Sequence, residues 1–96
     1  MALEYYKKAL TLEPYRPTLY KNLADIYYLQ GNLDQAITLN QRGFTLSQSD
    51  YHWPLQLSLL FRENKNLPEA QKYLNQALKL APDNEELKKY QSELNK

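Results

Sequence analysis

His52 is the only histidine of the chain and the first candidate for chemistry, because histidine titrates near neutral pH and serves as a general base. Ser49 and Asp50 precede it, so the three residue types of a catalytic triad stand close together. Serine and aspartate at this point are better explained as a helix cap, since their side chains accept the free backbone N–H groups of a helix start. We therefore predict that His52 is a surface or groove residue and that no catalytic centre forms here.

The sequence also lacks the residues that a metal site or a phosphate-binding loop usually needs. With no cysteine and one histidine, a metal site would depend on carboxylates. Glu85, Glu86 and Asp34 stand where first-turn acids favoured by the helix dipole are expected. The two glycines, Gly31 and Gly43, do not form a phosphate-binding pattern. The sequence thus predicts a protein that is not an enzyme and holds no metal or cofactor.

Nine tyrosines raise the possibility of base stacking on single-stranded nucleic acid. Four of them, Tyr6, Tyr20, Tyr27 and Tyr73, fall on helix faces that should pack. Tyr28, Tyr51 and Tyr90 are expected to be freer. The formal net charge is +1, whereas phosphate binding needs a basic stripe. We predict no nucleic-acid partner.

The bulk composition is that of an ordinary globular domain, with 96 residues, 43% of them hydrophobic and 24% charged. No run approaches the roughly 20 apolar residues of a membrane span, and no signal peptide is recognisable. Direct membrane insertion is therefore not expected, and a cytoplasmic location is the default expectation.

The elements that position these residues repeat along the chain. Ala2, Ala36 and Ala70 stand 34 residues apart, and so do Leu12, Leu46 and Leu80. The segments PTLYKNLADIYYLQGN and YHWPLQLSLLFRENKN align in the same register. Such a period predicts a stack of similar helical units.

The residues that recur at this 34-residue spacing resemble the tetratricopeptide repeat. The first full repeat carries an aromatic, then leucine and a small residue, a tyrosine and an alanine, namely Tyr20, Leu23, Ala24, Tyr27 and Ala36; the second carries Leu57, Ser58, Phe61, Ala70, Ala77 and Pro82. The pattern is interrupted by Pro54, Asn40, Gly43 and Gln48. The resemblance implies an all-α, right-handed superhelical solenoid of antiparallel helix pairs.

Helical periodicity and capping residues predict six helices. Asn32, Asn66 and Asp83 each precede Gln or Glu by three positions, as in a capping box. The expected helices are 2–12, 17–30, 33–46, 52–64, 67–80 and 84–95. They make one domain, 1–96, divided into the second helix of a truncated repeat (1–16), two repeats (17–50 and 51–84) and a polar capping helix (85–96).

The first helix is expected to have an uncovered apolar face, because every repeat of a solenoid leans on its neighbours. Leu3, Tyr6 and Leu10 lie on that helix. We therefore expect either a fragment of a longer protein or a weak homodimer through these residues.

A binding surface follows from the resemblance, which implies that the first helix of each pair lines a concave face. By position the peptide- or partner-binding residues would be Thr18, Lys21, Asn22, Asp25, Tyr28, His52, Leu55, Gln56, Leu59, Arg62, Lys89 and Tyr90. Leu55 and Leu59 form the apolar anchor, unless one or both pack inside.

Some family members clamp a C-terminal carboxylate with lysine, asparagine and arginine. Lys21 matches that pattern, but Asp25 and Gln56 replace its asparagines, and Glu86 and Tyr90 stand at the closing basic positions. An acid in place of a base repels a carboxylate, so this clamp is not expected. The leading hypothesis is a non-catalytic protein-interaction module; the alternative is a structural or oligomerisation segment of a larger enzyme or membrane assembly.

Overall fold

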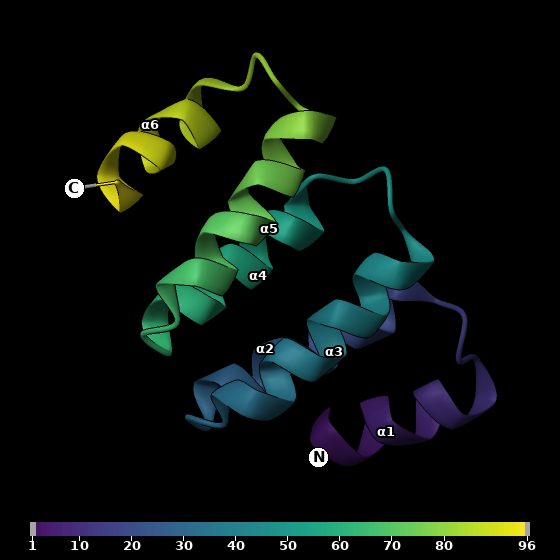
Figure 1. Cartoon of the computed structure of the whole chain (residues 1–96). Coiled ribbons are helices and arrows are strands. Elements are labelled where there is room, and N and C mark those ends of the chain that lie inside the picture. The colour runs from purple at the N-terminus through teal and green to yellow at the C-terminus, as the bar shows by residue number, and fades with distance from the viewer. Residues whose placement is uncertain (1, 96) are drawn as a thin grey trace. The chain divides into compact units, whose positions relative to one another are not determined.

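The structure, a computed structural model, describes residues 2–95, and all regular structure in that range is α-helical. Figure 1 shows the helices in chain order: α1 (Ala2–Leu12), α2 (Pro17–Leu29), α3 (Leu33–Leu46), α4 (His52–Glu63), α5 (Leu67–Leu80) and α6 (Glu85–Leu94). These bounds differ from the expected ranges at terminal residues only. The predicted all-α helical repeat is confirmed, while the predicted repeat boundaries stay a prediction.

Asparagine side chains cap three of the helices. Asn32 Oδ1 accepts the backbone N–H of Gln35 at 3.3 Å, and Asn66 Oδ1 accepts that of Glu69 at 3.3 Å. The expected cap at Asp83 is wrong. The cap of α6 is Asn84, whose Oδ1 accepts the Leu87 N–H at 3.1 Å and which starts the helix one residue later than expected.

The turns after α2 and α4 share one geometry. Gly31 has a φ of 80° and Lys65 a φ of 62°, both in the left-handed region. The residue after each donates its N–H back across the helix end, Asn32 to Tyr27 O at 2.9 Å and Asn66 to Phe61 O at 2.8 Å. These are Schellman-type ends, which normally use glycine. The left-handed position of the second repeat is occupied by a lysine.

The helices form two compact units, one ending at Gln48 and the other beginning at Ser49. In the first unit, α2 packs against both α1 and α3, and α2 and α3 form an antiparallel pair. Asn40 of α3, one of the residues that interrupt the repeat pattern, is buried, and its Nδ2 donates to Ala36 O at 2.9 Å. The amide is thus accommodated by a bond within its own helix.

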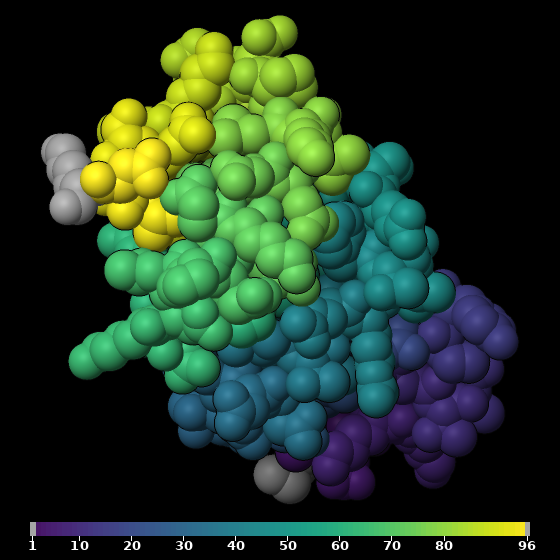
Figure 2. Space-filling view, viewed as in Figure 1, coloured from purple at the N-terminus to yellow at the C-terminus, as the bar shows by residue number. Residues whose placement is uncertain are grey.

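In the second unit, α5 packs against both α4 and α6. The space-filling view shows α6 (yellow) lying against α5 (green) in Figure 2. Leu74 and Ala77 of α5 form a buried cluster with Leu87 and Tyr90 of α6. Pro54 is buried in the first turn of α4, where a missing N–H is tolerated.

No helix within residues 2–95 is both long enough and apolar enough to cross a lipid bilayer.

Candidate partner-binding face

The expected binding residues of α2 lie at helical spacing on the first unit. Thr18, Lys21, Asp25 and Tyr28 are exposed, and Asn22 is partly covered. Lys21 Nζ lies 3.5 Å from Asp25 Oδ2, an exposed ion pair one helical turn apart. Exposed ion pairs contribute little to stability. This one places the Asp25 carboxylate beside Lys21, which is the only basic residue among the five expected binding residues of α2.

The expected binding residues of α4 are not equally accessible. His52, Gln56 and Arg62 are exposed, and Leu59 keeps 38% of its surface exposed. Leu55 is partly buried and packs against the cluster shared by α5 and α6. Of the two leucines, Leu59 is therefore the more exposed.

Tyr90 was expected to be freer, and this expectation is wrong: its side chain is only 8% exposed. Its hydroxyl lies 3.0 Å from Ser58 Oγ, and Ser58 Oγ donates to Ala70 O at 2.6 Å. Because Ser58 has one hydroxyl proton and gives it to Ala70, Tyr90 must donate to Ser58. This relay joins α6 to α4 and α5. Ser58 stands at the small-residue position of the repeat pattern, but nothing in the sequence paired it with Tyr90.

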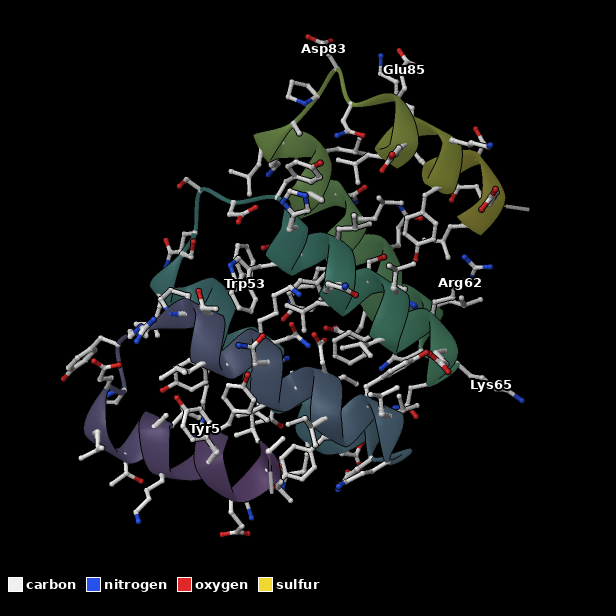
Figure 3. All side chains as sticks on the ribbon, turned by 180° about the vertical axis from the view of Figure 1, so that it is seen from behind. Tyr5, Trp53, Arg62, Lys65, Asp83 and Glu85 are labelled. Atoms are coloured by element: carbon white, nitrogen blue, oxygen red, sulfur yellow. The ribbon has the colours of Figure 1, made fainter. Side chains whose placement is uncertain are left out.

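Arg62 covers the ring of the same tyrosine. Its guanidinium carbon lies 5.5 Å from the centroid of the Tyr90 ring, a cation–π arrangement. Figure 3 shows Arg62 on α4, and exposed Lys89 stands next to Tyr90 on α6. The second unit therefore combines an exposed leucine, a stacked arginine and a lysine on α4 and α6.

His52 is held at the start of α4 rather than beside a nucleophile. Its Nδ1 lies 2.7 Å from Asp50 Oδ1, and its backbone N–H donates to the same oxygen at 3.0 Å. Its ring stacks on Tyr51, with centroids 4.2 Å apart. The backbone hydrogen bond is the main cause of a lowered pKa of Asp50. Asp50 thus has the capping role expected of it, although the cap position itself is Tyr51.

The apolar residues of α1 divide into two stripes. Leu3, Tyr6 and Leu10, the residues expected to be open, are partly covered. The more exposed residues are Tyr5, at 67%, and Leu12, at 77%. This second stripe was not predicted, although the spacing of seven residues between Tyr5 and Leu12 is visible in the sequence.

The site offers contacts but no reactive group that we can assign. Within the described residues no three histidine, aspartate or glutamate side chains gather as metal ligands.

A profile of the tetratricopeptide repeat matches residues 15–83 of the chain. The chain belongs to the tetratricopeptide repeat family. Among curated proteins, the anaphase-promoting complex subunit 6 of Dictyostelium discoideum is 38% identical over 65 residues, which are 62% of this chain and 8% of that protein. The chain therefore spans a small part of that relative.

Solved tetratricopeptide structures match nearly the whole chain. The first such domain of Spaghetti, bound to the HSP90 peptide SRMEEVD, has a TM-score of 0.84 at 22% identity over 97% of this chain and 74% of its own. The Yersinia enterocolitica secretion chaperone SycD, in complex with a peptide of the translocator YopD, has a TM-score of 0.81 at 18% identity over 97% and 71%. At these identities the likeness establishes the fold.

Proposed function

We propose that the chain is a non-catalytic interaction module that binds a peptide or partner surface on the face formed by the first helices of its pairs. The observation that carries the proposal is the exposed Leu59 on α4, one turn from Arg62, whose guanidinium lies over Tyr90. Leu59 supplies an apolar contact, and Arg62 and Lys89 supply charge that fixes the register of the bound segment.

The similar structures support this proposal, because Spaghetti and SycD are both seen with peptides bound. The residues of α2, namely Thr18, Lys21, Asn22, Asp25 and Tyr28, belong to the proposed face by their repeat positions. His52 and Gln56 are proposed binding residues of α4, in the second unit, by the same repeat positions. No metal, cofactor or nucleic acid is part of the proposed mechanism.

An acidic C-terminal tail is not the ligand that we propose. Lys21 already has Asp25 beside it at 3.5 Å, and Glu86 stands where such a clamp needs a base. A second carboxylate would meet repulsion at both places. A segment with an apolar side chain and a single acid fits the pairing of Leu59 with Arg62 better.

A second proposal concerns assembly: the chain is a structural or oligomerisation segment of a larger enzyme or membrane assembly. It is favoured by the similar Dictyostelium discoideum protein, which is a subunit of a larger complex. The weak homodimer through Leu3, Tyr6 and Leu10 remains a prediction. Light scattering at rising concentration tests it, with a dimer that Tyr6→Asp abolishes as the expected result.

Selection of displayed peptides tests the leading proposal. A random peptide library is selected on the immobilised chain, and the enriched peptides are titrated by calorimetry. We expect micromolar binding that Leu59→Asp and Arg62→Glu each weaken at least tenfold, while the helical circular-dichroism signal persists. The control is Leu67→Asp, which places the same charge at an exposed leucine on α5.

Equal binding to wild type and Leu59→Asp would refute this face as the binding site. A library from which nothing is enriched would favour the structural proposal.

A further inference from the structure

The guanidinium of Arg62 rests on an aromatic ring that is itself held in place. Its central carbon lies 5.5 Å from the centroid of the Tyr90 ring, and Tyr90 is only 8% exposed. The Tyr90 hydroxyl lies 3.0 Å from Ser58 Oγ, which donates to Ala70 O at 2.6 Å. Because the ring is buried and its hydroxyl is bonded, the cation has a fixed support, while the Arg62 side chain remains exposed to solvent.

The charge of Arg62 is open to a ligand. None of the ion pairs found among residues 2–95 involves Arg62. An arginine presents its N–H donors in the plane of the guanidinium, and a carboxylate can accept two of them side by side. A guanidinium that lies over a ring can therefore still offer these donors to an acid.

A lysine of the same unit makes a similar contact with a different outcome. Lys72 Nζ lies 5.5 Å from the centroid of the Tyr73 ring, but Glu69 Oε2 lies 3.9 Å from the same nitrogen. An ammonium is also a compact point charge without a planar face. The charge of Lys72 is thus already paired, and this contact is an internal reference for Arg62.

The surroundings of Arg62 limit what can bind there. Leu59 stands three residues earlier on α4, is 38% exposed and is a neighbour of Arg62 on the helix surface. Glu86 and Glu93 stand one turn to either side of Tyr90 on α6, and both are exposed. Two acids near the cation oppose a strongly negative ligand. The site therefore fits an apolar group with a single negative charge.

We propose that Arg62 and Leu59 recognise an aromatic side chain that is accompanied by one carboxylate. The ring of the ligand lies against Leu59 and the guanidinium, so that the cation is enclosed between this ring and Tyr90, and the carboxylate accepts the N–H donors of Arg62. A second ring face adds to the attraction of the first, because both rings present their negative faces to the cation. This inference rests on the proposed function and names the kind of residue that the face takes.

The probe is N-acetyl-tryptophan, which carries an aromatic ring and one carboxylate in a single small molecule. It is titrated into the isotope-labelled full chain, and the Arg62 Nε–Hε signal is followed by NMR spectroscopy. We expect saturable binding in the millimolar range that shifts this signal and leaves the backbone amide signals of Lys72 and Tyr73 in place. Two matched probes remove one feature each, since N-acetyl-leucine lacks the ring and N-acetyl-tryptophanamide lacks the charge. Each should bind about fivefold more weakly.

An exchange of arginine for lysine separates the planar group from the charge. Arg62→Lys should weaken binding of N-acetyl-tryptophan about fivefold and that of N-acetyl-leucine much less, because lysine keeps the charge and loses the planar fork. The control is Arg42→Lys, the same exchange at an exposed arginine of α3. Neither of the cation–π contacts found among residues 2–95 involves Arg42, so this variant should bind as the wild type does.

Three results would overturn the inference: no shift of the Arg62 signal at saturating probe, equal affinity for N-acetyl-leucine and N-acetyl-tryptophan, or equal losses from Arg62→Lys and Arg42→Lys. The proposed function has a separate test in the displayed peptides. Enriched peptides that depend on Leu59 and Arg62 but contain no aromatic residue would overturn this inference and leave the proposed function in place.

Discussion

Replacing Lys65 by glycine should stabilise the chain. A non-glycine residue in the left-handed region costs about 1–2 kcal/mol, and Lys65 has a φ of 62°. Glycine adds freedom to the unfolded chain, which costs about 0.5–1 kcal/mol. The difference predicts that Lys65→Gly raises the free energy of unfolding by about 0.5–1 kcal/mol. Figure 3 shows the Lys65 side chain extending away from the end of α4, so little contact is lost.

The first repeat supplies the reverse experiment. Gly31 occupies the equivalent turn with a φ of 80°, and a Cβ placed there meets nothing within 4 Å. Gly31→Ala therefore tests the backbone alone, without a steric clash, and should lower the free energy of unfolding by about 1 kcal/mol.

Urea denaturation followed by far-UV circular dichroism measures both changes, and thermal melts should move by a few degrees in opposite directions. Lys65→Ala is the control, because it removes the lysine side chain and leaves a Cβ. If Lys65→Gly were no more stable than Lys65→Ala, the positive φ would not be a source of strain and the reasoning would fail.

Three further predictions concern single interactions. Tyr90→Phe should lower the free energy of unfolding by about 1 kcal/mol in the wild type and by less in a Ser58→Ala background, as a urea-denaturation double-mutant cycle would show. Asn84→Ala should cost about 1 kcal/mol in the same assay and Asp83→Ala much less, because only Asn84 caps α6. The lowered pKa of Asp50 stabilises the fold at neutral pH, and this contribution is lost as the pH falls below about 4 and through the lowered value. Asp50→Asn should therefore flatten the acid side of a plot of melting temperature against pH.

Local signals in the sequence were sufficient for the helices. Periodicity and capping residues placed nearly every boundary, because both depend on neighbours a few positions away. The exception at α6 arose where Asp83 and Asn84 stand together and either can cap. The left-handed Lys65 was hidden because lysine is rare there, although its alignment with Gly31 pointed to it.

The surface was harder to predict, because exposure depends on contacts between helices. Tyr90 aligns with Asn22 and Gln56, which suggests an outward position, yet its hydroxyl reaches Ser58 on another helix. The choice between Leu3 and Tyr5 as the open side of α1 depends on where α2 packs, which the sequence of α1 does not encode. For the same reason, the sequence could not show that Leu55 packs inside and Leu59 is exposed.

The anchoring of α6 also has a dynamic consequence. The helix buries two side chains, Leu87 and Tyr90, and Tyr90 links it to α4 through a hydrogen bond to Ser58 and the cation–π contact with Arg62. Amide hydrogen exchange should therefore be faster in α6 than in α5, through local openings that leave the α4–α5 pair intact. Each opening would expose Ser58, Leu74 and Ala77 together. The unit thus holds a transient apolar surface that a ligand could trap.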